Sequence, residues 1–233
     1  SDVCSSDLPK YLEEVDPSIP SEENIRRLCF TREGILFRDF NQIFGQIFGT
    51  KSEARKSILK AIAHGSRSAA EIAEAMGIER NGHLVAHLSE LELAGFIAKD
   101  GGVNPSTGLD GRIVRYRLKD NYSRFYLHHI EPNAKAIESG LFQYGSLASL
   151  KGWNAIRGLQ FENLVMANLP RLLPMLGMDR VLLKSAAPFR QPATTRRRGC
   201  QVDLLLQSDR KVCIVEIKRK NTIGREIEDE VET

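Results

Sequence analysis

The feature that most constrains this chain is a pair of β-rich apolar runs near its C-terminal end, each of which carries charged residues. Residues 201–207 and 211–218 are separated by a short polar turn, which predicts an antiparallel hairpin. Asp203 lies among valine and leucines, whereas Glu216 and Lys218 are two residues apart and so point to one face of a strand. Because an unpaired carboxylate in a buried strand would be costly, we expect these three side chains to meet at one site, where a divalent cation neutralises the acids.

An aspartate followed on the next strand by Glu-x-Lys resembles the PD-(D/E)XK nuclease core, to which the preceding helix adds a glutamate. Residues 158–173 have helical periodicity that places Glu162 on the same stripe as Leu159 and Met166. We therefore include Glu162 in the predicted site. Two alternatives stay open: Glu162 is an edge residue that reaches solvent, or Glu216 and Lys218 belong to an ordinary exposed strand face with a cross-strand ion pair.

Residues 51–120 follow the plan of a winged helix-turn-helix. A capping box, Ser68-Ala-Ala-Glu71, starts the second of three predicted helices, and Gly77 ends it. The pattern then predicts a third helix and two strands around a loop rich in glycine, proline and aspartate. The apolar positions of the first and third helices are Ile58, Leu59, Ile62, Leu84, Leu88 and Leu91, and the strands are expected over 96–99 and 112–118.

The third helix of such a module would be the recognition helix. We expect it to offer Arg80, Asn81, His83, His87 and Ser89 to a major groove, while Arg112, Arg115 and Arg117 on the wing contact phosphates. The alternative is a protein-protein module whose arginine-rich strand is a solvated face. His83 and His87 are separated by one helical turn but have no carboxylate in a known zinc arrangement, so we interpret them as exposed helix-face residues.

The rest of the chain is predicted to be mainly helical. Residues 9–50 indicate helices with an apolar face, and residues 121–157 indicate a helical connector whose aromatic side chains are expected in the core. Residues 178–184 are expected to form the first strand of the C-terminal sheet, followed by a basic loop over 188–199. Residues 1–8 look like a translated sequencing adapter and are left out of the fold prediction.

Composition is that of a globular protein, with 233 residues, 27% charged residues and a net charge of +3. That charge is too small to predict nucleic-acid binding by itself. The sequence contains no membrane-spanning run and no signal peptide, and its cysteines lack metal spacing, so we expect a cytoplasmic protein with no membrane partner. It also contains no P-loop motif, so no cofactor-binding residue can be assigned to ATP.

Taken in order, the chain resembles the C-terminal part of the archaeal-type AAA-family ATPases. The resemblance is carried by 116–122, 124–126, 131–133, 158–162 and 200–203, and by Glu216-Ile-Lys218. It implies a helical lid remnant over 9–50, a winged helix-turn-helix over 51–120, a connector over 121–157 and a nuclease-like domain over 158–233 that is cut before its last strand. It also implies that the ATP-binding module, through which the protein could form a homo-oligomer, lies outside this sequence.

The predicted fold class is therefore α+β or α/β, with a lid remnant and winged helix followed by a truncated restriction-endonuclease-like αβββα core. The predicted function is DNA binding and Mg²⁺-dependent hydrolysis of DNA phosphodiesters. Asp203 and Glu216 would hold the metal with help from Glu162, and Lys218 would position or deprotonate the attacking water. The alternative is an inactive segment of a regulatory ATPase that binds DNA or a protein partner.

Overall fold

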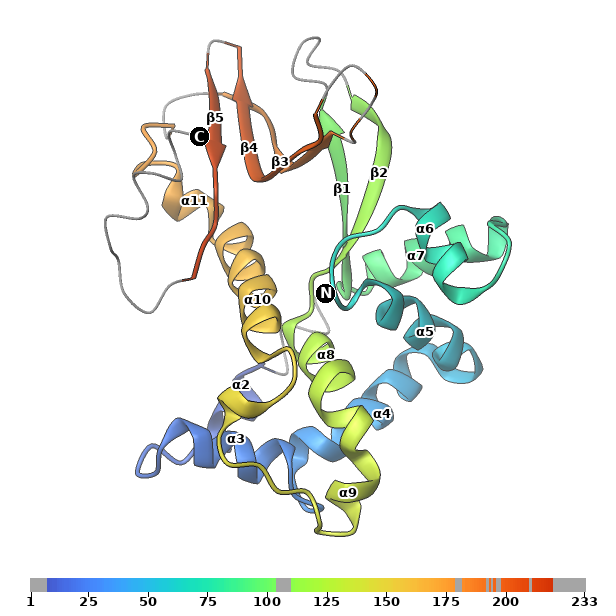
Figure 1. The fold of residues 1–233 in the computed structure, drawn as a ribbon, viewed down its shortest axis with the longest axis vertical. Helices are drawn as coiled ribbons and strands as arrows, with labels where there is room; N and C mark the ends of the chain where they lie inside the picture. The colour runs from blue at the N-terminus through green and yellow to red at the C-terminus, as the bar shows by residue number, and fades with distance from the viewer. Residues whose placement is uncertain are drawn as a thin grey trace. The chain divides into compact units, whose positions relative to one another are not determined.

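A computed structural model describes residues 8–103, 110–178, 182–191, 193, 195, 198–209 and 211–219. In these residues the chain combines helices with two small antiparallel sheets (Figure 1). Two compact units are present, Ser1–Ile156 and Arg157–Thr233, and the division falls within helix α10 (Trp153–Ala167). Each unit is described by itself.

The first unit begins with helices, as predicted for residues 9–50, and then forms the winged helix-turn-helix. Helix α3 begins at Ser21 and has Glu22 and Glu23 in its first turn, where the positive end of the helix dipole stabilises their carboxylates. No side chain caps this helix end. The elements before the wing are α2 (Leu8–Glu13), α3 (Ser21–Cys29), α4 (Ile35–Phe48), η1 (Gly49–Lys51), α5 (Ser52–Ile62), α6 (Ala69–Met76) and α7 (Gly82–Leu93).

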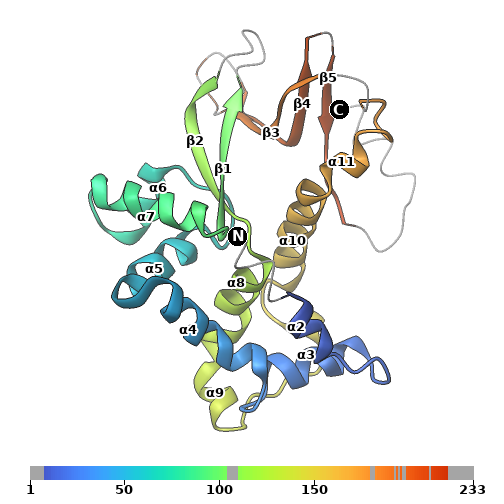
Figure 2. The same cartoon turned by 180° about the vertical axis from the view of Figure 1, so that it is seen from behind.

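The local signals of the winged module are confirmed. Ser68 Oγ accepts a hydrogen bond from the Glu71 amide and the Glu71 carboxylate accepts one from the Ser68 amide, which completes the capping box of α6. Gly77 ends α6 with a left-handed φ of 65°. The predicted apolar positions of α5 and α7 are all buried. Strands β1 (Ile97–Val103) and β2 (Asp110–Leu118) pair antiparallel and are longer than predicted (Figure 2).

The connector is built from short helical pieces, in keeping with the helical connector predicted over 121–157. A short helix, α8 (Asn121–Phe125), passes into the π-helical η2 (Tyr126–Ile130) and the 3₁₀ turn η3 (Glu131–Asn133), followed by α9 (Ala134–Glu138) and η4 (Leu147–Ser149). Its aromatic side chains lie in the core, as predicted. Tyr126 is buried and stacks on Phe40 of α4, with ring centroids 4.0 Å apart.

The second unit contains the end of α10, the short helix α11 (Leu169–Leu172) and one sheet. The helix predicted over 158–173 was wrong in its bounds, because α10 already begins at Trp153 and the helix is interrupted at Asn168. Pro170 lies in the first turn of α11, where its missing amide costs no intrahelical hydrogen bond. Leu169 then packs against the apolar core of the sheet.

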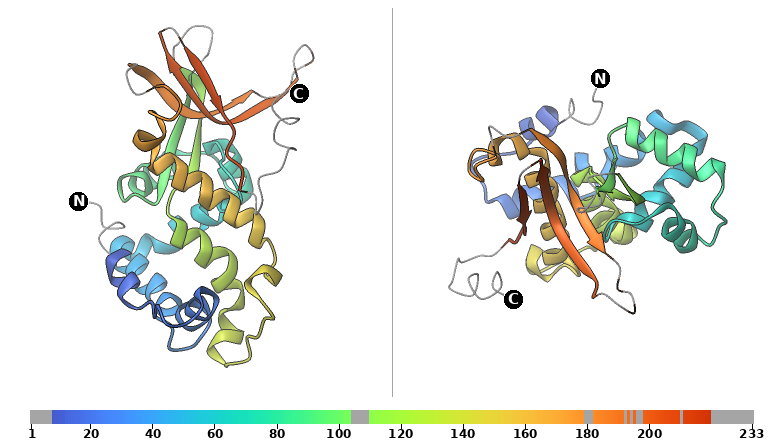
Figure 3. Two further views of the ribbon diagram at one scale, coloured as in Figure 1. Left: turned by 90° about the vertical axis from the view of Figure 1, so that its left-hand side faces the viewer. Right: turned by 90° about the horizontal axis from the view of Figure 1, so that it is seen from above.

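The sheet has the strand order β3-β4-β5, with β3 (Leu183–Gln191), β4 (Cys200–Ser208) and β5 (Val212–Val215) all antiparallel (Figure 3, right). The predicted hairpin is confirmed as β4-β5, with a shorter second strand. The prediction of a strand over 178–184 and a loop from Pro188 was wrong, because β3 continues to Gln191. Pro188 is tolerated because β3 is an edge strand and its register with β4 shifts between Ala187 and Phe189. Leu204 and Leu206 are fully buried and form a small core with Met178.

Candidate functional site

The solvent face of α7 is the surface that a recognition helix would present. His83 and Ser89 are exposed on this face, and Arg80, which lies two residues before the helix begins, is exposed as well. Asn81 is also exposed, but its Oδ1 accepts a hydrogen bond from the Leu84 amide at 3.0 Å and caps the helix. Its side chain therefore has a structural role in addition to the DNA contact predicted for it.

His87 differs from the other predicted groove contacts because it turns toward α5. Its side chain is half-buried, and its Nδ1 is buried without a hydrogen-bond partner among the described residues. Burial lowers its pKa, and the nearby Arg55 and Lys51 lower it further. The imidazole is thus kept neutral near pH 7 and is less available to a groove than His83.

The centre of the exposed α7 face is small and uncharged. Gly82, Ala86 and Ser89 succeed one another along it, and Leu93 at its end is 91% exposed. Small side chains allow a helix to approach a groove closely, and alanine and other apolar groups can contact thymine methyl groups. The same exposed apolar groups are also compatible with the protein-binding alternative.

Two of the predicted wing arginines form ion pairs inside the module. Arg115 on β2 lies 2.9 Å from Glu71 and donates hydrogen bonds to Ser66, so it ties the wing to the start of α6. Arg117 lies 2.9 Å from Asp100 on β1, and both side chains are mostly buried. The side chain of Arg112 lies outside the described residues. Arg115 and Arg117 thus stabilise the wing, and their predicted phosphate contacts would have to compete with these carboxylates.

Much of the remaining positive charge of the module is also paired. Arg55 forms an ion pair with Glu90, and Lys56 and Lys60 lie 2.6 Å and 2.8 Å from Glu131. Burial opposes ionisation of Glu131, but hydrogen bonds from the two lysines outweigh it and lower its pKa. The module therefore presents fewer available cations than its sequence suggests.

The hairpin brings two of the predicted acidic residues to neighbouring positions. Strands β4 and β5 pair from Gln207 opposite Val212 to Leu204 opposite Val215, and Asp203 and Glu216 are the next residues beyond this last pair. Asp203 Oδ2 accepts a hydrogen bond from the Ile217 amide at 2.8 Å, which holds the chain beyond β5 beside β4.

The lysine and the helix glutamate extend this arrangement only in part. Lys218 Nζ lies 3.9 Å from Glu216 Oε1, two residues away on the same segment, and both side chains are about half exposed. Glu162 is partly buried in the part of α10 that belongs to this unit. Within the described ranges, no three histidine, cysteine or acidic side chains come close enough to hold a metal ion. The structure therefore supplies two neighbouring carboxylates, and the role of Glu162 stays a prediction.

Sequence reasoning missed a partly buried polar network between α4, α5 and the connector. Asn41 donates a hydrogen bond to the Tyr126 hydroxyl at 2.9 Å and accepts one from Lys56 at 3.0 Å, and Lys56 also pairs with Glu131. Lys56 is buried, and a lysine that follows a basic residue on a helix gives no sequence signal of burial. The network is a structural link between the helical segment and the winged module.

The comparisons with known proteins agree with the winged module. The chain is 29% identical over 174 residues to an uncharacterized protein of Methanocaldococcus jannaschii, an alignment that covers 74% of this chain and 37% of that protein. No solved structure matches it. Among the described helices, none combines the length and apolar character needed to cross a bilayer. Residues 52–100 match the family described as Helix-turn-helix domain, and this match supports DNA binding.

Proposed function

We propose that this chain binds duplex DNA through α7, with Arg80 and His83 as the principal side-chain contacts. The observation that carries the proposal is the helix-turn-helix match, which contains an α7 whose N-terminal end and small, uncharged face are exposed. Recognition helices of this class contact base edges with residues near their N-terminus. Arg80 lies at that end and can contact either a phosphate or a guanine.

The internal ion pairs of the wing predict how this binding depends on salt. Each phosphate contact adds about 0.9 to the slope of log affinity against log salt concentration. Because Arg115 and Arg117 are paired with Glu71 and Asp100, we expect a shallower slope than a count of basic residues would give. Most of the difference in affinity between one DNA sequence and another would then come from contacts made by the exposed face of α7.

The test is a titration of labelled duplex DNA with the 233-residue chain across a range of salt concentrations. Arg80→Ala should weaken binding by roughly 5-fold to 150-fold, the cost of about 1–3 kcal/mol expected for one arginine contact. Arg38→Ala, which removes an exposed arginine of α4, is the matched control and should leave affinity unchanged. A folded wild type that does not bind DNA at low salt would overturn the proposal.

We further propose, as a second function, phosphodiester hydrolysis at the paired carboxylates of the hairpin. The observations that favour it are the hydrogen bond from the Ile217 amide to Asp203, which holds Asp203 beside the segment that carries Glu216, and the 3.9 Å distance from Lys218 to Glu216. These two carboxylates fit Mg²⁺, which proteins often bind through one or two carboxylates together with substrate phosphates. When bound, the metal would neutralise phosphate charge, while Lys218 would orient water toward the phosphorus and Ile217 would keep Asp203 oriented. ATP-dependent control by an AAA-type module is an extension of this proposal that rests on the family resemblance.

Nicking of supercoiled plasmid in Mg²⁺ tests the second function. Activity should be lost in Asp203→Asn and in Lys218→Ala, and retained in Asp209→Asn, which removes an exposed acid at the turn of the same hairpin. DNA binding through α7 should persist in all three variants. Absence of cleavage by a wild type that binds DNA would leave a binding module as the function of this chain.

A further inference from the structure

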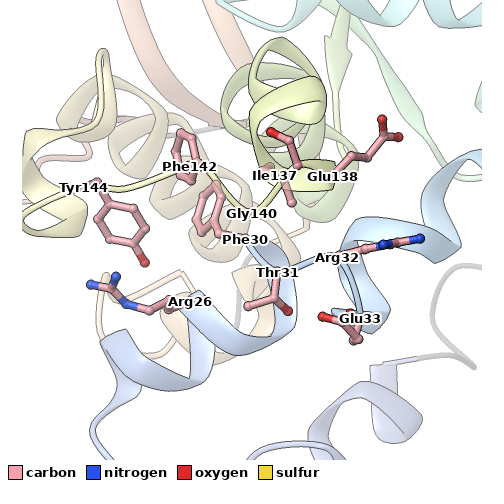
Figure 4. A pocket seen from close by; sticks show the side chains of 11 residues that line it. Arg26, Phe30, Thr31, Arg32, Glu33, Ile137, Glu138, Gly140, Phe142 and Tyr144 are labelled. Atoms are coloured by element: carbon pink, nitrogen blue, oxygen red, sulfur yellow. The ribbon is translucent and has the colours of Figure 1, made fainter.

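A cavity of about 430 Å³ lies in the helical part of the first unit, away from the winged module. It is formed by the end of α3 and the turn after it on one side, and by α9 and the segment that follows on the other (Figure 4). This volume is within the range of pockets that hold small molecules. Nothing in the proposed DNA-binding or hydrolytic function uses it.

The middle of the cavity has an aromatic wall. Phe30 stacks on Phe142 with ring centroids 5.0 Å apart, and Tyr144 packs edge-on against Phe30 at 5.3 Å. Ile137 is buried at the same cavity. Phe30 is 5% exposed and backs the wall, whereas Phe142 and Tyr144 are partly exposed. A planar apolar ring is the ligand shape that such a wall favours, because it can stack or pack edge-to-face on these two rings.

One end of the cavity offers hydrogen-bond donors. The Arg26 guanidinium lies 4.5 Å from the centroid of the Tyr144 ring. Its Nε is 3.4 Å from Glu23, in an ion pair whose two side chains are 38% and 55% exposed and which is therefore weak. The Tyr144 hydroxyl is buried and has no hydrogen-bond partner among the described residues. Burial raises the pKa of this hydroxyl, so it stays a neutral donor.

The charges at the two ends differ in sign. Figure 4 shows Arg26 beside Tyr144 at one end, whereas Glu33 and Glu138 lie with Arg32 at the other, on the exposed rim. Arginine has donors and no acceptor, and a buried tyrosine hydroxyl without a partner is a destabilising feature that a bound acceptor would relieve. The donor end is therefore suited to an anionic group, next to the aromatic wall.

We propose that this cavity binds a planar aromatic ligand that carries an anionic group. The ring packs on Phe142, which Phe30 supports from behind, and the anion is bound by Arg26. A small shift of the Tyr144 side chain lets its hydroxyl donate to the same anion. Two sources share this chemistry, a nucleoside monophosphate and an aromatic carboxylate. The site would be distinct from the α7 surface, so its occupation and DNA binding can be measured separately.

Calorimetric titration of the 233-residue chain with AMP and with indole-3-acetate tests the proposal and separates the two sources. We expect saturable binding of one of them with a Kd below about 1 mM. Adenosine and inorganic phosphate, which each lack one half of the ligand, should bind at least tenfold more weakly. Binding of neither probe, or equal binding of AMP and adenosine without any binding of indole-3-acetate, would overturn it.

Three variants test the residue roles. Arg26→Gln should weaken binding by about tenfold or more, since it removes a charged donor. Tyr144→Phe should weaken binding by roughly 3-fold to 10-fold while leaving thermal stability equal or higher, because the hydroxyl it removes has no partner. Glu138→Gln, on the exposed rim, is the matched control and should not weaken binding. Unchanged affinity in both Arg26→Gln and Tyr144→Phe, with folding intact, would contradict the assignment.

Discussion

Replacement of the buried Arg124 by methionine should destabilise the first unit by about 3–6 kcal/mol. Arg124 is 1% exposed, and its guanidinium donates hydrogen bonds to the carbonyls of Ala63, at 2.7 Å, and of Leu118. Ala63 caps the C-terminal end of α5 and Leu118 ends β2, so one side chain joins the first helix of the winged module to its wing. A hydrogen bond from a charged donor contributes about 1.5–3 kcal/mol, and two are lost, while methionine keeps most of the apolar packing.

Urea unfolding followed by tryptophan fluorescence measures this change. Trp153 is the one tryptophan of the chain, and it packs on Phe125 and His129 in the same unit, so its emission reports on that unit. Arg38→Met, at an exposed position of α4, is the control and should change the unfolding free energy by less than about 0.5 kcal/mol. A loss below about 1 kcal/mol in Arg124→Met would refute the reasoning, because it would mean that the cost of burying the charge offsets both hydrogen bonds.

Two further predictions concern titratable groups of the first unit. Glu131→Gln should cost about 2 kcal/mol of unfolding free energy at pH 7, because it leaves the buried Lys56 without its carboxylate. The folded-state pKa of Glu131 is lowered, so the stability advantage of the wild type should be present above the unfolded-state pKa of this group. In urea titrations that advantage should disappear as pH falls below about 4. Burial, with a smaller contribution from His128, lowers the pKa of His129 to about 4, so wild-type stability should fall as pH drops from about 6.5 toward 4, by at most about 1.4 kcal/mol per pH unit. His129→Phe should abolish this part of the slope, and an unchanged slope would contradict it.

The winged module could be predicted from sequence because its signals are local. The capping box at Ser68 and Glu71 and the terminating Gly77 each depend on residues within one helical turn, and the structure confirms them. The partners of its arginines could not be predicted in the same way. Arg115 meets Glu71 across 44 positions of sequence, and only the packing of β2 against the start of α6 brings them together. Such pairing is decided by tertiary structure, and a basic strand therefore looked more available to DNA than it is.

In the C-terminal unit the hairpin was predicted correctly, whereas the bounds of the helix before it and of the first strand were not. Two prolines account for these differences. The predicted helix is interrupted just before Pro170, which lies in the first turn of α11, whereas Pro188 is tolerated inside the edge strand β3, where a loop was predicted. Neither the interruption of the helix nor the continuation of the strand follows from the pattern of apolar residues, because each depends on which backbone amides form hydrogen bonds in the folded protein.

The register of the hairpin is the step that connects sequence and chemistry in this unit. A shift of one residue would move Leu204 and Leu206 out of the core, so their burial fixes the pairing of β4 with β5. Once the pairing is fixed, Asp203 and Glu216 follow directly after its last pair, Leu204 and Val215, and the Ile217 amide donates a hydrogen bond to Asp203. The apolar residues thus determine where the carboxylates meet. Moving Glu216 by one position while keeping Leu204 and Leu206 buried should consequently abolish Mg²⁺-dependent cleavage, if the hairpin is its site, without unfolding the sheet.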